Sequence, residues 1–204
     1  MKTYQTGNIR NVVLLGSSKS GKTTLSEAMM FEGKVIDRRG TIEAKNTISD
    51  NTEIEQLNQR SIYSTPLYTE FLDNKFNIMD TPGADDFIGG VISSFKVSDA
   101  GILVVNAQQG VEVGTEIFVR YAEEHKKPLV VAINQLDAEK ASYENTVETL
   151  KQSFGKKIAL IADIMIDCRP RVLKNSSYLN FKLLSAYFIG PLISKRKRTD
   201  VMKG

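Results

Sequence analysis

Eight consecutive residues near the start of the chain combine glycine, hydroxyl and lysine side chains in a pattern suited to binding phosphate. The run Gly16-Ser17-Ser18-Lys19-Ser20-Gly21-Lys22-Thr23 fits G-x-x-x-x-G-K-[ST], and we include the next residue, Thr24, in the candidate site. Backbone N–H groups of such a loop surround an anion, and the helix that follows adds the positive end of its dipole. Lys22 would reach the β- and γ-phosphates of a nucleotide, and the Thr23 hydroxyl would ligate Mg²⁺. A glycine turn without a ligand is the alternative, and the strand and helix patterns on either side argue against it.

A second motif, Asp80-Thr81-Pro82-Gly83, ends an apolar run. A carboxylate at a strand end would lie at the carboxyl edge of the sheet, beside the phosphate loop, where Asp80 can hold Mg²⁺ through a water. The N–H group of Gly83 can then donate to a γ-phosphate, since glycine tolerates whatever backbone angles this needs. Alone, the four residues would be an ordinary turn.

A third motif, Asn134-Gln135-Leu136-Asp137, follows another apolar run. The Asp137 carboxylate can accept hydrogen bonds from N1–H and N2–H₂ of guanine, a pair of donors that adenine lacks. Asn134 can bond N7 of the base and the phosphate loop, and the aliphatic part of Gln135 can cover the base. Alone, the tetrapeptide is more typical of a helix N-cap region, but together with the other motifs it favours GTP over ATP.

The segments between these motifs alternate between strand and helix patterns. Apolar runs predict buried strands at 11–15, 101–106, 128–133 and 157–162, and helical spacing predicts helices at 23–31, 114–124 and 139–154. Two more strands, 67–72 and 76–79, flank the polar turn 73–75 as a hairpin, while the polar segment 33–59 predicts a mobile loop with at most a short helix. This order predicts an α/β fold with a doubly wound, mostly parallel sheet and one antiparallel hairpin.

Composition excludes several classes of protein. With 41% hydrophobic and 25% charged residues among 204, the chain can bury a core and is not disordered throughout. Residues 1–157 hold 18 basic and 21 acidic side chains, and this balance argues against a polycationic DNA-binding body. Residues 158–204 hold 9 basic and 3 acidic side chains. One cysteine, Cys168, excludes an internal disulfide, and one histidine, His125, excludes a histidine-rich metal site. Without a signal-peptide pattern or a long apolar run, we expect a cytoplasmic protein with no membrane segment.

The three motifs, in this order, resemble the GTPase domain of translational GTPases. Asp86-Phe87 and Gly110-Val111-Glu112 are similar to elongation factor G, and the Asn-Gln-Leu-Asp form of the third motif is similar to the divergent elongation factor G-like proteins. The resemblance covers residues 8–157. It implies a P-loop GTPase fold, GTP or GDP and Mg²⁺ as ligands, Thr23 and Asp80 at the metal, the ribosome as partner, and a monomer.

Three positions depart from the family pattern. Ala84 stands where the family has the histidine that positions the attacking water. Tyr63 stands where the first switch of the family has the threonine that closes on Mg²⁺, although Ser64 or Thr65 could supply a hydroxyl after a shift. Lys19 replaces an aspartate associated with a monovalent cation and could supply that charge directly. We therefore expect slow intrinsic GTP hydrolysis and assign no catalytic residue.

We expect residues 1–162 to form the GTP-binding domain and residues 163–204 to be a divergent basic tail, either poorly ordered or the remnant of a truncated or frame-shifted product. The leading hypothesis is a GTP-binding domain that acts at the ribosome as part of a full elongation factor G-like protein. A non-hydrolysing guanine-nucleotide module, favoured by Ala84 and Tyr63, and a nonfunctional fragment, favoured by the tail, stay open as alternatives. Asp137 opposes a P-loop ATPase or kinase.

Overall fold

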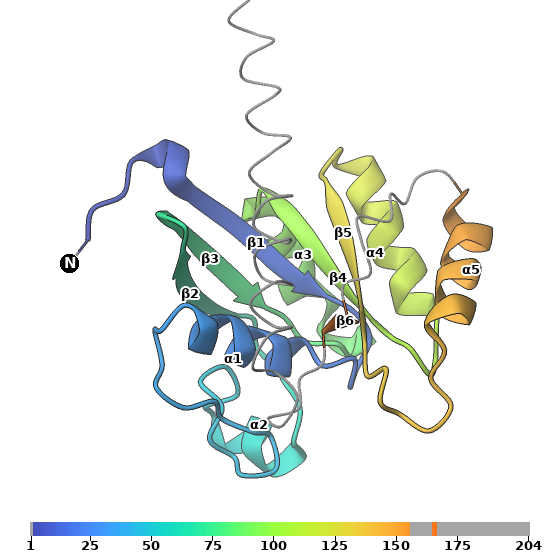
Figure 1. Cartoon of the computed structure of the whole chain (residues 1–204), viewed down its shortest axis with the longest axis horizontal. Helices are drawn as coiled ribbons and strands as arrows, with labels where there is room; N and C mark the ends of the chain where they lie inside the picture. Colours follow the sequence, from blue (N-terminus) through green and yellow to red (C-terminus); the bar gives the residue numbers. More distant parts are fainter. Residues whose placement is uncertain (1, 156–164, 167–204) are drawn as a thin grey trace, which may run out of the picture.

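The computed structural model describes residues 2–155 and 165–166, in which one twisted sheet lies between helices (Figure 1). Six strands form it in the order β2-β3-β1-β4-β5-β6. Only β2 and β3 pair antiparallel, and the other neighbours pair parallel. This confirms the predicted doubly wound α/β sheet with one hairpin. The strands are β1 (Ile9–Leu15), β2 (Thr65–Phe71), β3 (Asn74–Asp80), β4 (Ala100–Asn106), β5 (Leu129–Asn134) and β6 (Met165–Ile166).

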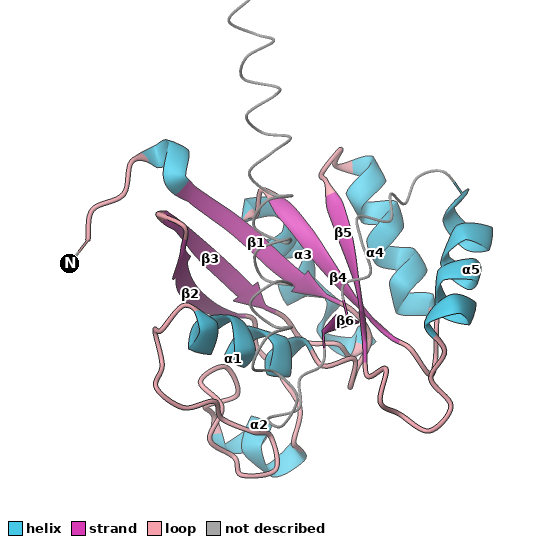
Figure 2. Cartoon of the chain, viewed as in Figure 1, coloured by secondary structure: helices cyan, strands magenta, loops and turns pink. Residues whose placement is uncertain are grey.

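Helices cover both faces of the sheet (Figure 2). They are α1 (Lys22–Glu32), α2 (Glu53–Asn58), α3 (Ile88–Val97), α4 (Val113–Glu124) and α5 (Tyr143–Phe154), with short 3₁₀ turns at Thr6–Asn8 and Asp85–Phe87. Leu25 and Met29 of α1 pack in one apolar core on the first face. On the second face α3, α4 and α5 share another core, around Phe95, Phe118 and Leu150. No helix in the described ranges is long and apolar enough to cross a membrane.

The central strands are buried on both faces, as parallel sheets require. Every residue of β4 is buried, and so are the last four residues of β1. Because β1, β3, β4 and β5 run in one direction, their carboxyl ends meet at one edge of the sheet. There Leu14 pairs with Asp80, and Asn106 pairs with Asn134. The three motifs are therefore brought to the same edge.

Several predicted boundaries were wrong, each for a local reason. The fifth helix begins at Tyr143 rather than residue 139, because the Ser142 hydroxyl accepts a hydrogen bond from the backbone N–H of Asn145 and caps it. The hairpin turns at Leu72 and Asp73 rather than 73–75, since both adopt the left-handed backbone angles that a two-residue turn needs. Helix α3 was not predicted, because a pair of glycines follows its first residue, Ile88. The strand predicted at 157–162 and the tail at 163–204 lie outside the described residues, apart from β6.

Candidate functional site

The phosphate loop connects β1 to α1, and its two glycines adopt positive φ angles of 143° at Gly16 and 95° at Gly21. Both also allow close approach of other chain segments. A Cβ atom on Gly16 would lie 2.3 Å from the Val104 carbonyl oxygen, and one on Gly21 would lie 2.1 Å from Asn134 Nδ2. Glycine is therefore required at both positions, by backbone angle and by space.

Lys22 is buried at the start of α1. Its Nζ atom donates to the carbonyl oxygens of Gly16 and Ser17, both at 2.9 Å. Burial lowers the pKa of Lys22 to about 8, although Asp80, Asp50 and Glu112 oppose this. A Cβ atom on Gly83 would lie 2.4 Å from Nζ, so the backbone of the second motif passes directly beside this amine.

Asp80 ends β3 with no exposed surface. Its Oδ2 atom accepts a hydrogen bond from the Ser26 hydroxyl at 3.3 Å, while Oδ1 has no hydrogen-bond partner in the described part of the chain. Burial raises the pKa of this carboxyl group, against the effect of Ser49, Lys22 and Thr23 nearby. A buried carboxylate oxygen without a partner beside hydroxyl groups is suited to a hydrated divalent cation.

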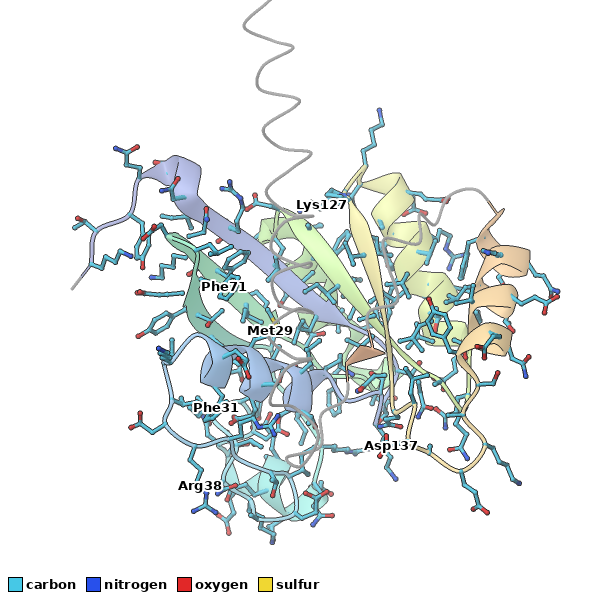
Figure 3. All side chains as sticks on the ribbon, viewed as in Figure 1. Met29, Phe31, Arg38, Phe71, Lys127 and Asp137 are labelled. Carbon is cyan, nitrogen blue, oxygen red and sulfur yellow. The ribbon has the colours of Figure 1, made fainter. Side chains whose placement is uncertain are left out.

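The third motif lies against the phosphate loop. Asn134 Nδ2 donates to the Ser20 carbonyl oxygen at 2.9 Å, and Gln135 Nε2 donates to the Lys19 carbonyl oxygen at 2.8 Å. Asp137 is exposed in the loop that follows β5 (Figure 3). The structure thus brings the two amides of this motif onto the phosphate loop, whereas Asp137 does not line the cleft above it.

A cleft of about 470 Å³, part of it open to solvent, lies over the loop. Seven predicted positions line it: Ser18, Lys19, Gly21, Lys22, Thr23, Gly83 and Ala84. Five more lining residues were not predicted from the sequence: Ile42, Asp50, Gln59, Arg60 and Ser61. Thr24 is half-buried on α1 and is not among the lining residues.

The hydroxyl that meets the phosphate loop comes from Ser61. Its Oγ atom lies 3.2 Å from Thr23 Oγ1. Ser64 and Thr65, which could supply a hydroxyl only after a shift, do not lie there: Thr65 donates to the Ser49 carbonyl oxygen at the start of β2, and Ser64 does not line the cleft. No periodic pattern marks this segment, so only the distance reveals Ser61.

Asp50 is the second carboxylate of the cleft. It is buried, and neither of its carboxylate oxygens has a hydrogen-bond partner in the described ranges. Burial raises the pKa of Asp50 to about 6, against a smaller lowering by the Ser61 hydroxyl. Asp50, Asp80, Thr23 and Ser61 therefore offer the oxygen ligands that Mg²⁺ prefers, directly or through water. No group of three or more acidic, histidine or cysteine side chains suited to a metal occurs in the part of the chain described, so phosphate and water would complete such a site.

Two buried glutamates hold the polar segment 33–64 around the cleft. Glu27 of α1 accepts from the backbone N–H groups of Gly40 at 2.8 Å and Ile48 at 2.6 Å. Glu55 of α2 accepts from those of Ile62 at 3.0 Å and Tyr63 at 3.1 Å. The predicted short helix is present as α2. The two glutamate anchors, which fix where Asp50 and Ser61 lie, were not predicted.

The chain is similar in sequence and in structure to known translation factors. The family described as elongation factor Tu GTP binding domain matches residues 7–194. An elongation factor G-like protein of Thermotoga maritima is 38% identical over 151 residues, which is 74% of this chain and 21% of that protein. A mitochondrial ribosome-releasing factor 2 of Meyerozyma guilliermondii is 31% identical over 75% of this chain and 18% of its own length. A crystal structure from Thermus thermophilus superposes with a TM-score of 0.70 at 32% identity, covering 73% of this chain and 22% of that one. This chain therefore spans about a fifth of the length of these relatives.

Proposed function

We propose that the cleft of this chain binds GTP and GDP in preference to ATP. The chain belongs to the elongation factor Tu GTP binding domain family and is a GTP-binding domain of the elongation factor G-like kind. The contact between Asn134 and Ser20 supports this proposal, because it joins the third motif, which would read the base, to the phosphate loop although 114 residues separate the two in the chain. A nucleotide with its phosphates in the loop would then present its base to the segment that holds Asp137.

Six residues in or near the cleft would each have a part in this binding. Lys22 would leave the carbonyl oxygens of Gly16 and Ser17 for the β- and γ-phosphates, whose charge favours the protonated amine. Gly83 would donate its N–H to the γ-phosphate beside Lys22. Thr23 and Asp80 would hold Mg²⁺, which neutralises charge on the phosphate oxygens. Asn134 and Asp137 would bond the guanine base.

We further propose that intrinsic hydrolysis is slow. Ala84 lines the cleft next to Gly83, and its methyl group can neither donate nor accept a hydrogen bond to orient water. This observation favours nucleotide binding as the basal activity of the domain. Action at the ribosome, to which the name of the relative from Meyerozyma guilliermondii points, would be the role of a longer protein that contains this domain.

Displacement of a fluorescent GDP analogue tests the proposal. GTP and GDP should displace it at much lower concentrations than ATP. Asp137→Asn should weaken the binding of GDP and favour the binding of xanthosine diphosphate, because an amide reverses the hydrogen-bond pattern at that position. Glu139→Gln, which changes an exposed carboxylate two residues away, is the control and should leave the selectivity unchanged. Equal competition by ATP would contradict the proposed function.

A further inference from the structure

Three hydrogen bonds in series connect the loop after β4 with the phosphate loop. The backbone N–H of Gln108 donates to Asn106 Oδ1 at 2.8 Å, and Asn106 Nδ2 donates to Gln135 Oε1 at 2.6 Å. Gln135 Nε2 then donates to the Lys19 carbonyl oxygen at 2.8 Å. Every donor meets an acceptor, so the series has one direction and fixes the orientation of both side-chain amides.

In this series of hydrogen bonds, Asn106 is held by burial in the sheet, whereas Gln135 and Lys19 have strained backbone angles. Asn106 is 5% exposed at the last position of β4, where it pairs with Asn134 of β5. Gln135 and Lys19 have φ angles of 60° and 62°, in the left-handed region that residues other than glycine seldom adopt. The bond from Gln135 to Lys19 therefore joins two strained turns, one in the base-reading motif and one in the cradle.

We propose that Asn106 is a positioning residue, which aims the Gln135 amide at the phosphate loop, and that Asn106 and Gln135 act as one matched pair. Asn106 does not line the cleft, so its effect on a ligand passes through Gln135 and Lys19. The effect on nucleotide binding rests on the proposed function, whereas the pairing of the two side chains does not depend on it.

The direction of the series determines which substitutions are compatible. In Asn106→Asp, the carboxylate faces Gln135 Oε1, and rotating the glutamine amide would turn its oxygen toward the Lys19 carbonyl. In Gln135→Lys, the ammonium faces Asn106 Nδ2, and rotating that amide would turn its NH₂ group toward the N–H of Gln108. The double variant removes both conflicts, because an aspartate accepts from Gln108 and from the lysine, which also donates to Lys19.

The experiment measures Asn106→Asp, Gln135→Lys and the double variant in two ways. Without nucleotide, the Tm of each single variant should be about 5 °C lower than that of the unchanged protein. The Tm of the double variant should fall by less than the sum of the two single decreases. The dissociation constant of a fluorescent GDP analogue should rise about tenfold in each single variant and return to within about threefold of the unchanged protein in the double variant. Gln109→Lys, which adds the same charge at an exposed neighbouring position, should change neither quantity.

Rescue separates a matched pair from two residues that only support the fold. Additive losses in the double variant, or a Gln135→Lys protein that melts and binds like the unchanged one, would overturn the proposal. If the unchanged protein does not bind the GDP analogue, the proposed function fails, and the unfolding measurements still decide whether the two side chains are paired. A double variant that folds where a single variant does not supports the pairing.

Discussion

The hydroxyl groups of Thr23 and Ser61 lie 3.2 Å apart, although 38 residues separate them in the chain. Thr23 is the second residue of α1, at the end of the phosphate loop, and Ser61 follows α2 in the segment that Glu55 anchors. The distance shows that this segment closes on the loop through a serine, where the family pattern pointed to a threonine two residues later. A short side chain thus supplies the second hydroxyl at the proposed Mg²⁺ position.

Ser61→Ala should therefore weaken the dependence of nucleotide binding on Mg²⁺. Loss of one oxygen at the ion should raise the Mg²⁺ concentration needed for half-maximal GTP binding about tenfold, with little change in binding when EDTA is present. Ser64→Ala is the control, because Ser64 does not line the cleft. An unchanged Mg²⁺ titration in Ser61→Ala would show that this hydroxyl does not serve the ion.

Asp50 should make the stability of the nucleotide-free protein depend on pH. Its pKa rises from 3.8 to about 6 on folding, so the folded state binds more protons than the unfolded state between these values. The free energy of unfolding should then fall as pH rises through this range, and Asp80, whose pKa is also raised, adds to the fall. With EDTA present, Asp50→Asn should flatten part of the profile and raise Tm at pH 7. Asp37→Asn, in the exposed part of the same segment, should keep the original profile, and an equally steep profile in Asp50→Asn would contradict the assignment.

Glu27→Gln should loosen the segment around the cleft. The carboxylate accepts from the N–H groups of Gly40 and Ile48, and a glutamine would direct an NH₂ group at one of them, which costs about 1–3 kcal/mol. Trypsin should then cut faster after Arg38 and Arg39, which lie in this segment; Figure 3 marks Arg38. Glu43→Gln, at an exposed site in the same segment, should leave the rate of cleavage unchanged.

Lys127→Met should destabilise the fold away from the cleft. Lys127 Nζ donates to the carbonyl oxygens of Phe95, Lys96 and Ser98, at 2.5, 2.7 and 2.6 Å, and so satisfies the end of α3. Loss of these bonds should lower the free energy of unfolding by about 1–2 kcal/mol without changing nucleotide affinity. Urea denaturation measures this, and Lys126→Met at the exposed neighbouring position should have little effect. Equal stabilities of the two variants would contradict the role of Lys127.

The sequence predicted the sheet and the three motifs because their signals are local. Apolar runs mark β1 and β4, and the loop between Gly16 and Thr23 is a continuous pattern. Asp50 and Ser61 could not be predicted this way, since they lie in a polar segment without periodicity, and Glu27 and Glu55 place them through hydrogen bonds to backbone groups. The pairing of Asn106 with Gln135 joins side chains 29 residues apart, and no local pattern records it.

Ala84→His should accelerate GTP hydrolysis more than any other single change in the cleft. Phosphoryl transfer requires Mg²⁺, stabilisation of charge and an attacking water in line with the γ-phosphate. Lys22, Thr23 and Asp80 can meet the first two requirements, but the methyl group of Ala84, beside Gly83 in the cleft, cannot orient water. Restoring a group that positions water should raise the single-turnover rate by roughly 10²- to 10⁴-fold, equivalent to about 3–5 kcal/mol of barrier.

Release of phosphate from GTP, measured with and without ribosomes, tests the role of Ala84. Ala44→His, which places the same side chain in the exposed part of the segment around the cleft, should hydrolyse GTP no faster than the unchanged chain. GTP affinity should stay within a few-fold in both variants, because the histidine would act on water rather than on the bound nucleotide. Rapid hydrolysis by the unchanged chain would show that another group in the cleft already positions the water, and Arg60 and Ser61, which line it, would be the next residues to replace.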